Sequence, residues 1–329
     1  MNSHNYPSPE TVLANDSFIS ICVPTYCRPF YLRKLLDTLA EFADMPYEVI
    51  VHDDGSVPHF QEELFAMRDK ISILSFNTNR FNQGLPAAAN HCIRPASSKY
   101  VLFCNDDCFF VRPCLKDLCN VLSKPYVGIL SPANAVGPLN SQEAMIVNGT
   151  RFAISNYLGG GSCIAFRKEV YDEVGGWNEK STSGQADNVF VYSILKKGYW
   201  KAVLEGPDRM KVGNFVYGDD YKPTQGFTRG HDCHFPRIFG IDLKKLELLG
   251  HRHRESCQYW IDANRCWPNR QDGRPNVECS ANDIDGWGNH FLKVYGNRNS
   301  HSTHDIDWEV AKRFGHDKWK EQIEKDRSS

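Results

Sequence analysis

The sequence lacks the features that mark several classes of protein. No apolar run approaches the roughly 18–20 residues that a membrane-spanning helix requires. The first residues, MNSHNYPSPETVLANDS, are polar and contain proline, so they resemble neither a signal peptide nor a membrane anchor. The formal net charge is only −2, which argues against a general nucleic-acid-binding protein. We therefore expect a cytoplasmic protein without a transmembrane segment, with peripheral membrane association and oligomeric state left open.

Cysteine is not scarce, since the chain has 12. Cys22 and Cys104 lie in apolar, strand-like runs, where a free thiol behaves as a small hydrophobic group. Because no export signal precedes them, we expect these cysteines to be reduced rather than paired in disulfides.

The first 135 residues alternate between short apolar runs and helical patterns. Strands are predicted at 20–23, 48–51, 71–76, 100–104 and 127–130, and helices at 28–43, 60–68, 84–93 and 115–122. Such alternation predicts an α/β fold with a mostly parallel sheet flanked by helices. Further along, an apolar run at 163–166 precedes predicted helices at 168–174 and 187–197. Beyond about residue 205 the pattern is irregular, with helices expected only at 243–249 and 307–325.

Three predicted strands end in polar segments: Pro24-Thr25-Tyr26, Asp53-Asp54-Gly55-Ser56 and Asn105-Asp106-Asp107. The first of these is expected to break its strand at Pro24. In parallel α/β sheets, ligands bind outside the carboxyl ends of the strands. Two adjacent carboxylates at such an end require a positive partner, which a lysine, an arginine or a metal ion can supply. The three strand ends together therefore predict a ligand site at one edge of the sheet.

Several segments taken together resemble the family 2 glycosyltransferases of the GT-A fold, over about residues 17–200. The resemblance is carried by SICVPTYCRPFYLRKLLDTL, EVIVHDDGS, NRFNQGLPAAANHCIRPASSKYVLFCNDDC and GGWNE, in this order and spacing. It implies a GT-A-type sheet with a less regular C-terminal extension. With the irregular pattern beyond residue 205, we expect a polar extension (1–16), a nucleotide-sugar-binding half (17–135), an acceptor-binding half (136–240) and a C-terminal extension of unknown role (241–329).

The resemblance implies an inverting, metal-dependent transfer of a sugar from a UDP- or GDP-sugar to a saccharide or glycolipid, for instance in polysaccharide biosynthesis. By position, Asp107 would bind Mn²⁺ or Mg²⁺ and Asp53 would accept a hydrogen bond from the nucleobase. The other residues that the resemblance or their position places in the donor site are Pro24, Thr25, Tyr26, Asn82, Gly84, Asn105 and Asp106. For Gly84 a purely structural role at the start of a helix is an equal alternative to ligand binding, and for Asp54 a turn-stabilising role is at least as well supported as a binding role.

The resemblance also places a general base at the start of the helix that ends before Gly198, which points to Asp187. The preceding residue is Ala186, where the family usually has glutamate. A cap on its own helix is the alternative role for Asp187. The late histidine that often ligates the metal is absent near residues 213–214, so His231 and His234 are candidate replacements.

Two alternative functions were compared with the same residues. A nucleotidyltransferase would need a glycine-rich phosphate loop after the first strand, and Pro24-Thr25-Tyr26 provides none. A glycan- or nucleotide-binding protein on a catalytically retired fold is consistent with the missing glutamate and histidine, although the three binding aspartates are retained. Trp177 fits either a role in stacking on an acceptor sugar or a place in the core.

Overall fold

The computed structural model describes residues 18–26, 28–56, 74–79, 83–139, 144–154, 162–179, 186–212, 306, 308–312 and 315–328. Its centre is a nine-stranded sheet in the order β3-β2-β1-β4-β9-β6-β10-β8-β7. These strands are β1 (Ile19–Thr25), β2 (Tyr47–Asp53), β3 (Leu74–Thr78), β4 (Tyr100–Cys104), β6 (Val127–Val136), β7 (Met145–Val147), β8 (Thr150–Ile154), β9 (Cys163–Arg167) and β10 (Trp200–Glu205). All of them except β8 and β9 run in one direction, which confirms the predicted mostly parallel architecture.

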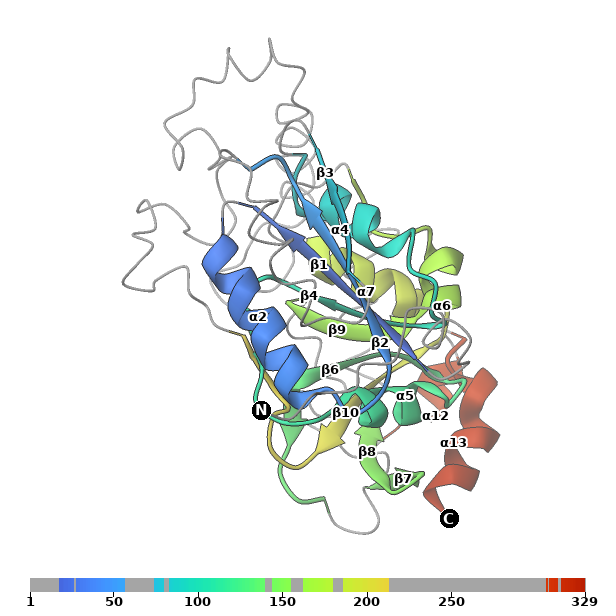
Figure 1. Cartoon of the computed structure of the whole chain (residues 1–329). Coiled ribbons are helices and arrows are strands. Elements are labelled where there is room, and N and C mark those ends of the chain that lie inside the picture. Colours follow the sequence, from blue (N-terminus) through green and yellow to red (C-terminus); the bar gives the residue numbers. More distant parts are fainter. Residues whose placement is uncertain are drawn as a thin grey trace, which may run out of the picture.

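Helices cover both faces of this sheet, with α2 in front of the strands and α7 behind them in Figure 1. The described helices are α2 (Pro29–Phe42), α4 (Leu85–Ile93), α5 (Leu115–Leu122), α6 (Lys168–Val174), α7 (Ala186–Lys196), α12 (Trp308–Lys312), η5 (Asp317–Trp319) and α13 (Lys320–Arg327). Among these, no helix has the length and apolar character needed to cross a membrane. The predicted helices at 60–68 and 243–249 lie outside the described residues.

The central strands are buried on both faces, because helices pack on each side. Every residue of β1, β2 and β4 is buried. This explains why they read as continuous apolar runs rather than as alternating strands. On one face, α2 buries Leu32, Leu35, Leu36 and Leu39, which the helical repeat places on a single stripe. Cys22 and Cys104 are buried free thiols, as predicted.

The break expected at Pro24 was wrong, because β1 continues through Pro24 to Thr25. Pairing with β4 ends at Cys22, whereas pairing with β2 continues at Pro24 and Thr25. Proline lacks a backbone donor and is tolerated where a strand reaches the end of a ladder. The first strand therefore delivers Thr25 to the edge of the sheet inside regular structure.

The outer strands β7, β8 and β10 were not predicted. The β7–β8 hairpin turns at Asn148-Gly149, with φ of 48° and 81°. An Asn-Gly pair between apolar segments is the usual signal for a two-residue hairpin, because both positions require positive φ. β5 (Cys108–Phe110) and β11 (Met210–Val212) were also not predicted, and they form a separate antiparallel pair.

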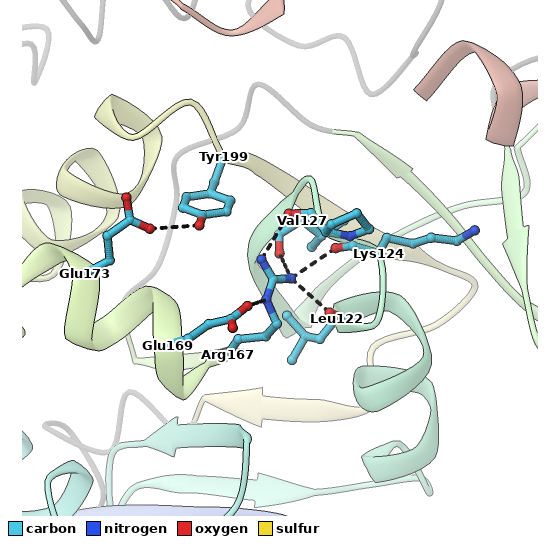
Figure 2. A network of polar contacts seen from close by, with 8 residues as sticks. Leu122, Lys124, Val127, Arg167, Glu169, Glu173 and Tyr199 are labelled. Atoms are coloured by element: carbon cyan, nitrogen blue, oxygen red, sulfur yellow. Dashed lines mark hydrogen bonds and ion pairs between the residues drawn. The ribbon is translucent and has the colours of Figure 1, made fainter. Parts of the chain in front are cut away.

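Arg167 fixes the connection between α5 and β6, and Figure 2 shows its guanidinium group pointing into that connection. Its Nη1 donates to the carbonyl oxygens of Leu122, Lys124 and Val127 at 2.9, 3.0 and 2.7 Å. Nη2 donates to the Pro125 carbonyl at 3.0 Å, and Nε donates to Glu169 at 2.7 Å. A planar group with five donors can satisfy several carbonyl groups of one connection at the same time.

The charged C-terminal segment does not form the single helix expected at 307–325. α12 ends at Lys312, and Gly315 has φ of 74°, a left-handed conformation that ends the helix before η5 and α13 begin. This segment packs against the sheet domain (Figure 1): the Tyr126 hydroxyl donates to Asp326 at 2.9 Å, and Ile323 is fully buried. The boundary placed between residues 240 and 241 stays a prediction.

Candidate functional site

The predicted polar strand ends meet at the carboxyl edge of β1, β2 and β4. Thr25 and Asp53 are paired in register as the last residues of β1 and β2. The Thr25 hydroxyl donates to Asp106 Oδ2 at 2.8 Å, which ties the end of β1 to the segment that follows β4. The structure thus brings Thr25, Asp53 and Asp106 to one edge, as the sequence predicted.

Asn105, Asp106 and Asp107 form the turn between β4 and β5. The Asn105 N–H group donates to the Ser162 carbonyl at 2.8 Å, and the Cys108 N–H group donates to the Asn105 carbonyl at 3.1 Å. β5 in turn pairs with β11, so that Val212 lies opposite Cys108. Val212, the last residue of β11, therefore lies beside the acidic turn, whereas positions 213–214, where the resemblance expects a histidine ligand, are outside the described residues.

Arg28 supplies positive charge to both aspartates of this turn. Its Nη1 lies 3.2 Å from Asp106 Oδ1 and 3.6 Å from Asp107 Oδ2. Arg28 immediately precedes α2, where Pro29 occupies the first turn. The sequence analysis considered an arginine partner but did not identify Arg28. The feature of the sequence that could have identified Arg28 is its position two residues after Tyr26, beside the polar end of β1.

The charges of this turn are strongly affected by burial. Burial raises the pKa of Asp106, although Arg28 and the Thr25 hydroxyl partly offset the effect. Burial, followed by repulsion from Asp106, raises the pKa of Asp107 to about 6. For both aspartates, ionisation of the carboxyl group is less favourable in the folded protein than in water. A cation bound beside them would favour the ionised form.

The acidic turn offers oxygen ligands that fit a hard divalent cation. Within the described part of the chain, Asp107 Oδ1 and Asn105 Oδ1 are buried without a hydrogen-bond partner. Carboxylate and amide oxygens are the ligands that Mg²⁺ and Mn²⁺ take. The described residues contain no cluster of three or more His, Cys, Asp or Glu side chains suited to a metal. The remaining ligands would therefore be waters, ligand oxygens or residues outside the described ranges.

Asp53 and Asp54 have different surroundings. Asp53 Oδ1 accepts hydrogen bonds from the Ser56 N–H group at 3.0 Å and from the Ser56 hydroxyl, and Oδ2 accepts a long bond of 3.4 Å from Thr78. These contacts tie Asp53 to the turn that follows β2 and to the end of β3. The role of Asp53 in base binding stays a prediction.

Asp54 fastens the start of α4 to the end of β2. It accepts hydrogen bonds from Asn79 Nδ2 at 2.9 Å and from the N–H groups of Gln83 and Gly84 at 2.9 and 2.8 Å. Burial raises its pKa to about 7, with these donors acting in the opposite direction. The structural role expected for Asp54 agrees with these contacts. Because the Gly84 N–H group is occupied here, the proposed contact of Gly84 with a ligand would need another atom.

Asp187 lies in the first turn of α7 and is partly exposed, so it can reach solvent or a ligand. The sequence analysis missed Lys201 of β10, a fully buried lysine on whose charge Asp187 acts. Whether Asp187 is the general base stays a prediction at this point.

Trp177 belongs to the core. It is 2% exposed, and its ring stacks on Phe190 at 5.0 Å and lies 5.0 Å from Phe103. The alternative of stacking on an acceptor sugar is therefore wrong. Among the other predicted residues, Pro24 and Tyr26 are at the end of β1, whereas Asn82, His231 and His234 lie outside the described residues.

The fold is a mostly parallel α/β sheet with polar residues gathered at the carboxyl edge of its strands. Residues 20–175 match the family model described as Glycosyl transferase family 2. The domain that these residues form belongs to that family, which confirms the predicted family.

Three known proteins illustrate the similarity. A protein of Haemophilus influenzae described as "Uncharacterized glycosyltransferase" is 28% identical over 191 residues, which are 54% of this chain and 62% of that protein. The chain thus spans less than two thirds of this relative. The solved structure of S. aureus TarS 1-349 in complex with UDP-GlcNAc is similar with 21% identity and a TM-score of 0.46, over 59% of each chain. Mannosyltransferase PcManGT from Pyrobaculum calidifontis, in complex with GDP-Man and Mn²⁺, gives 18% identity and a TM-score of 0.47 over 75% of this chain and 74% of that one.

Proposed function

We propose that this protein is an inverting, divalent-metal-dependent glycosyltransferase. It moves a sugar from a nucleotide diphosphate sugar to a hydroxyl group of a saccharide or glycolipid. The observation that carries the proposal is the meeting of Thr25, Asp53 and the Asp106–Asp107 pair at one edge of the sheet, where Asp107 Oδ1 is buried without a partner in the described structure. Membership of the domain in family 2 supports sugar transfer as the reaction.

In the proposed reaction, the oxygen of the acceptor hydroxyl group attacks the anomeric carbon while the bond from that carbon to the diphosphate breaks. The electron pair of the broken bond leaves with the diphosphate, and Asp187 takes the proton of the hydroxyl group. A single displacement of this kind inverts the anomeric configuration. Asp187 is partly exposed at the start of α7, as a base that must meet an external hydroxyl group should be.

The donor would bind at the carboxyl edge of β1, β2 and β4. Asp53 would accept a hydrogen bond from the nucleobase, with Tyr26 beside it and with Asn105 and Asp106 near the ribose. Asp107 would hold Mn²⁺ or Mg²⁺, which when bound stabilises the charge of the leaving diphosphate as a Lewis acid. The Asp53 carboxylate can accept a hydrogen bond from an N–H group of either uracil or guanine, so both UDP- and GDP-sugars are candidate donors.

A thermal-shift panel with UDP, GDP, dTDP and CDP, each with and without Mn²⁺, tests the donor site. A ligand that binds only the folded state raises the melting temperature. We expect a metal-dependent rise with one nucleotide, which Asp107→Ala abolishes and the exposed Asp208→Asn control retains. The absence of a rise with every nucleotide at millimolar concentration would contradict the donor-site assignment.

Transfer assays with the corresponding nucleotide sugar then test catalysis. Asp187→Asn should keep the nucleotide-induced rise in melting temperature and lower kcat by about 10²–10⁴-fold, the usual contribution of a general base. Nucleotide binding without transfer to any saccharide acceptor would instead favour a glycan- or nucleotide-binding protein on a retired glycosyltransferase fold.

A further inference from the structure

Lys201 is a buried lysine of β10, and the reaction described above gives it no role. It is the second residue of β10, between β6 and β8, and only 1% of it is exposed. Lysine is seldom fully buried unless its charge is compensated. A negatively charged side chain near Lys201 would therefore explain why a lysine is buried at this position.

The strand register places Lys201 on the face of the sheet that α7 covers. Lys201 pairs with Ile129 of β6, and Ile129 pairs with Phe166 of β9. Residues that pair directly across strands project from the same face. The Phe166 ring contacts Phe190 of α7, with 5.3 Å between ring centroids. The neighbouring Trp200 projects from the opposite face, where its ring lies 5.9 Å from that of Trp308.

The helical repeat places Asp187 on the stripe of α7 that faces this part of the sheet. Asp187 precedes Phe190, Val191 and Ile194 by three, four and seven residues, a spacing that aligns side chains on one side of a helix. These three apolar residues are all buried against the sheet. Asp187 thus continues the buried stripe by one turn, about 5.4 Å along the helix.

The electrostatics agree with this placement. Burial lowers the pKa of Lys201 to about 7, and the Asp187 carboxylate acts in the opposite direction by favouring the protonated ammonium form. The residue paired with Lys201 on β6, Ile129, is apolar and offers no compensating charge. The electrostatic effect of Asp187 on the pKa of Lys201 thus agrees with the placement of the two residues on facing sides of α7 and β10.

We propose that Lys201 is a positioning residue for Asp187, which holds the carboxylate ionised and directed from α7 toward the acceptor hydroxyl group. This inference rests on the proposed function. The cation lowers the pH at which Asp187 becomes competent to accept a proton, because an opposite charge favours the ionised form of an acid. Removing the cation should raise that pH, whereas a residue that merely filled space would leave it unchanged.

The test compares the full-length protein with Lys201→Met and Lys201→Arg, using transfer assays from pH 5 to pH 9 at saturating donor. For Lys201→Met we expect the acid limb of the kcat profile to move up by about one pH unit, the lower end of the range for loss of a neighbouring opposite charge. Lys201→Arg should keep the acid limb near that of the unmodified protein, since it retains the charge. Lys116→Met, which removes an exposed lysine of α5, is the matched control and should change nothing.

Nucleotide-induced thermal shifts separate this inference from the proposed function. Replacement of a buried charge by an apolar side chain of similar volume is often neutral or stabilising, so Lys201→Met should remain folded and bind nucleotide. Transfer by Lys201→Met with an unmoved acid limb overturns the positioning role and leaves the proposed function standing. Failure of the unmodified protein to transfer sugar from any donor overturns both. If Lys201→Met does not fold, the profile of Lys201→Gln decides by the same criterion.

Discussion

A single side chain, Arg167, determines how α5 is joined to β6. Its guanidinium group donates to the carbonyl oxygens of Leu122, Lys124, Pro125 and Val127. Arg167 itself is only 9% exposed, and Leu122 and Val127 are fully buried. We predict that Arg167→Met lowers the free energy of unfolding by about 3 kcal/mol, since each buried group left without a partner costs about 1–3 kcal/mol. Urea denaturation measures the change.

Two further variants make this prediction specific. Arg167→Lys should recover only part of the loss, because an ammonium group offers three donors from one point rather than a planar fork. The exposed Arg112→Met should have no measurable effect. A loss below about 1 kcal/mol for Arg167→Met would show that water or backbone groups replace the guanidinium donors.

The sequence identified site residues that directly follow a strand, but it missed residues whose role depends on contact with another helix or strand. Thr25, Asp53 and Asp106 were found because a parallel sheet gathers strand ends at one edge. Arg28 was missed because its partner Asp106 is distant in sequence, and Lys201 was missed because its strand, β10, was not predicted. Local patterns place a residue on an element, but only packing of the elements decides which side chains come together.

At the scale of elements, Asp54 connects β2 to α4 through its three hydrogen bonds to Asn79, Gln83 and Gly84. Gly84 has φ of 92°, so the chain entering α4 adopts a conformation that favours glycine. Burial raises the pKa of Asp54 from 3.8 to about 7. Between these two pH values the folded protein keeps a proton that the unfolded chain has released, so stability falls as the pH rises.

We predict that this loss amounts to at most about 4 kcal/mol between pH 4 and pH 7, as about three pKa units correspond to that free energy. The measurement is the free energy of unfolding by urea at several pH values. Asp54→Asn cannot ionise and should remove this part of the slope, even if its hydrogen bonds are weaker. Asp37→Asn, on the exposed side of α2, is the control. Equal slopes for Asp54→Asn and the unmodified protein would refute the prediction.

Elements with strong periodicity were predicted well, and those defined by tertiary contacts were not. The helices α4, α5 and α6 have apolar residues at helical spacing and clear ends, and their predicted bounds agree with the structure to within one residue. Strands β10 and β11 were not predicted. β11 has only three residues and is defined by its pairing with β5. The β7–β8 hairpin was predictable in principle from Asn148-Gly149.

At the scale of the whole molecule, the C-terminal segment and the sheet domain pack as one body. Trp308 of α12 contacts Trp200 of β10, and Lys318 donates to the Lys197 carbonyl at 2.6 Å, directly after α7. Asp326 of α13 accepts from Tyr126 and lies 3.1 Å from Lys124. These contacts join the C-terminal segment to the α7–β10 connection and to the α5–β6 connection, although the sequence indicated only an extension of unknown role.

This packing predicts that a change in α13 destabilises the entire domain. Ile323 is fully buried, so Ile323→Ala should lower the free energy of unfolding by about 3 kcal/mol through lost burial and a cavity. Ile146→Ala is a matched control, because Ile146 is 46% exposed on β7. If residues 306–328 unfold together with the sheet, tryptophan fluorescence and far-UV circular dichroism should report one transition, shifted equally by Ile323→Ala. A separate early transition, with the main one unmoved, would instead make the C-terminal extension an independent unit and support a boundary between the sheet domain and this segment.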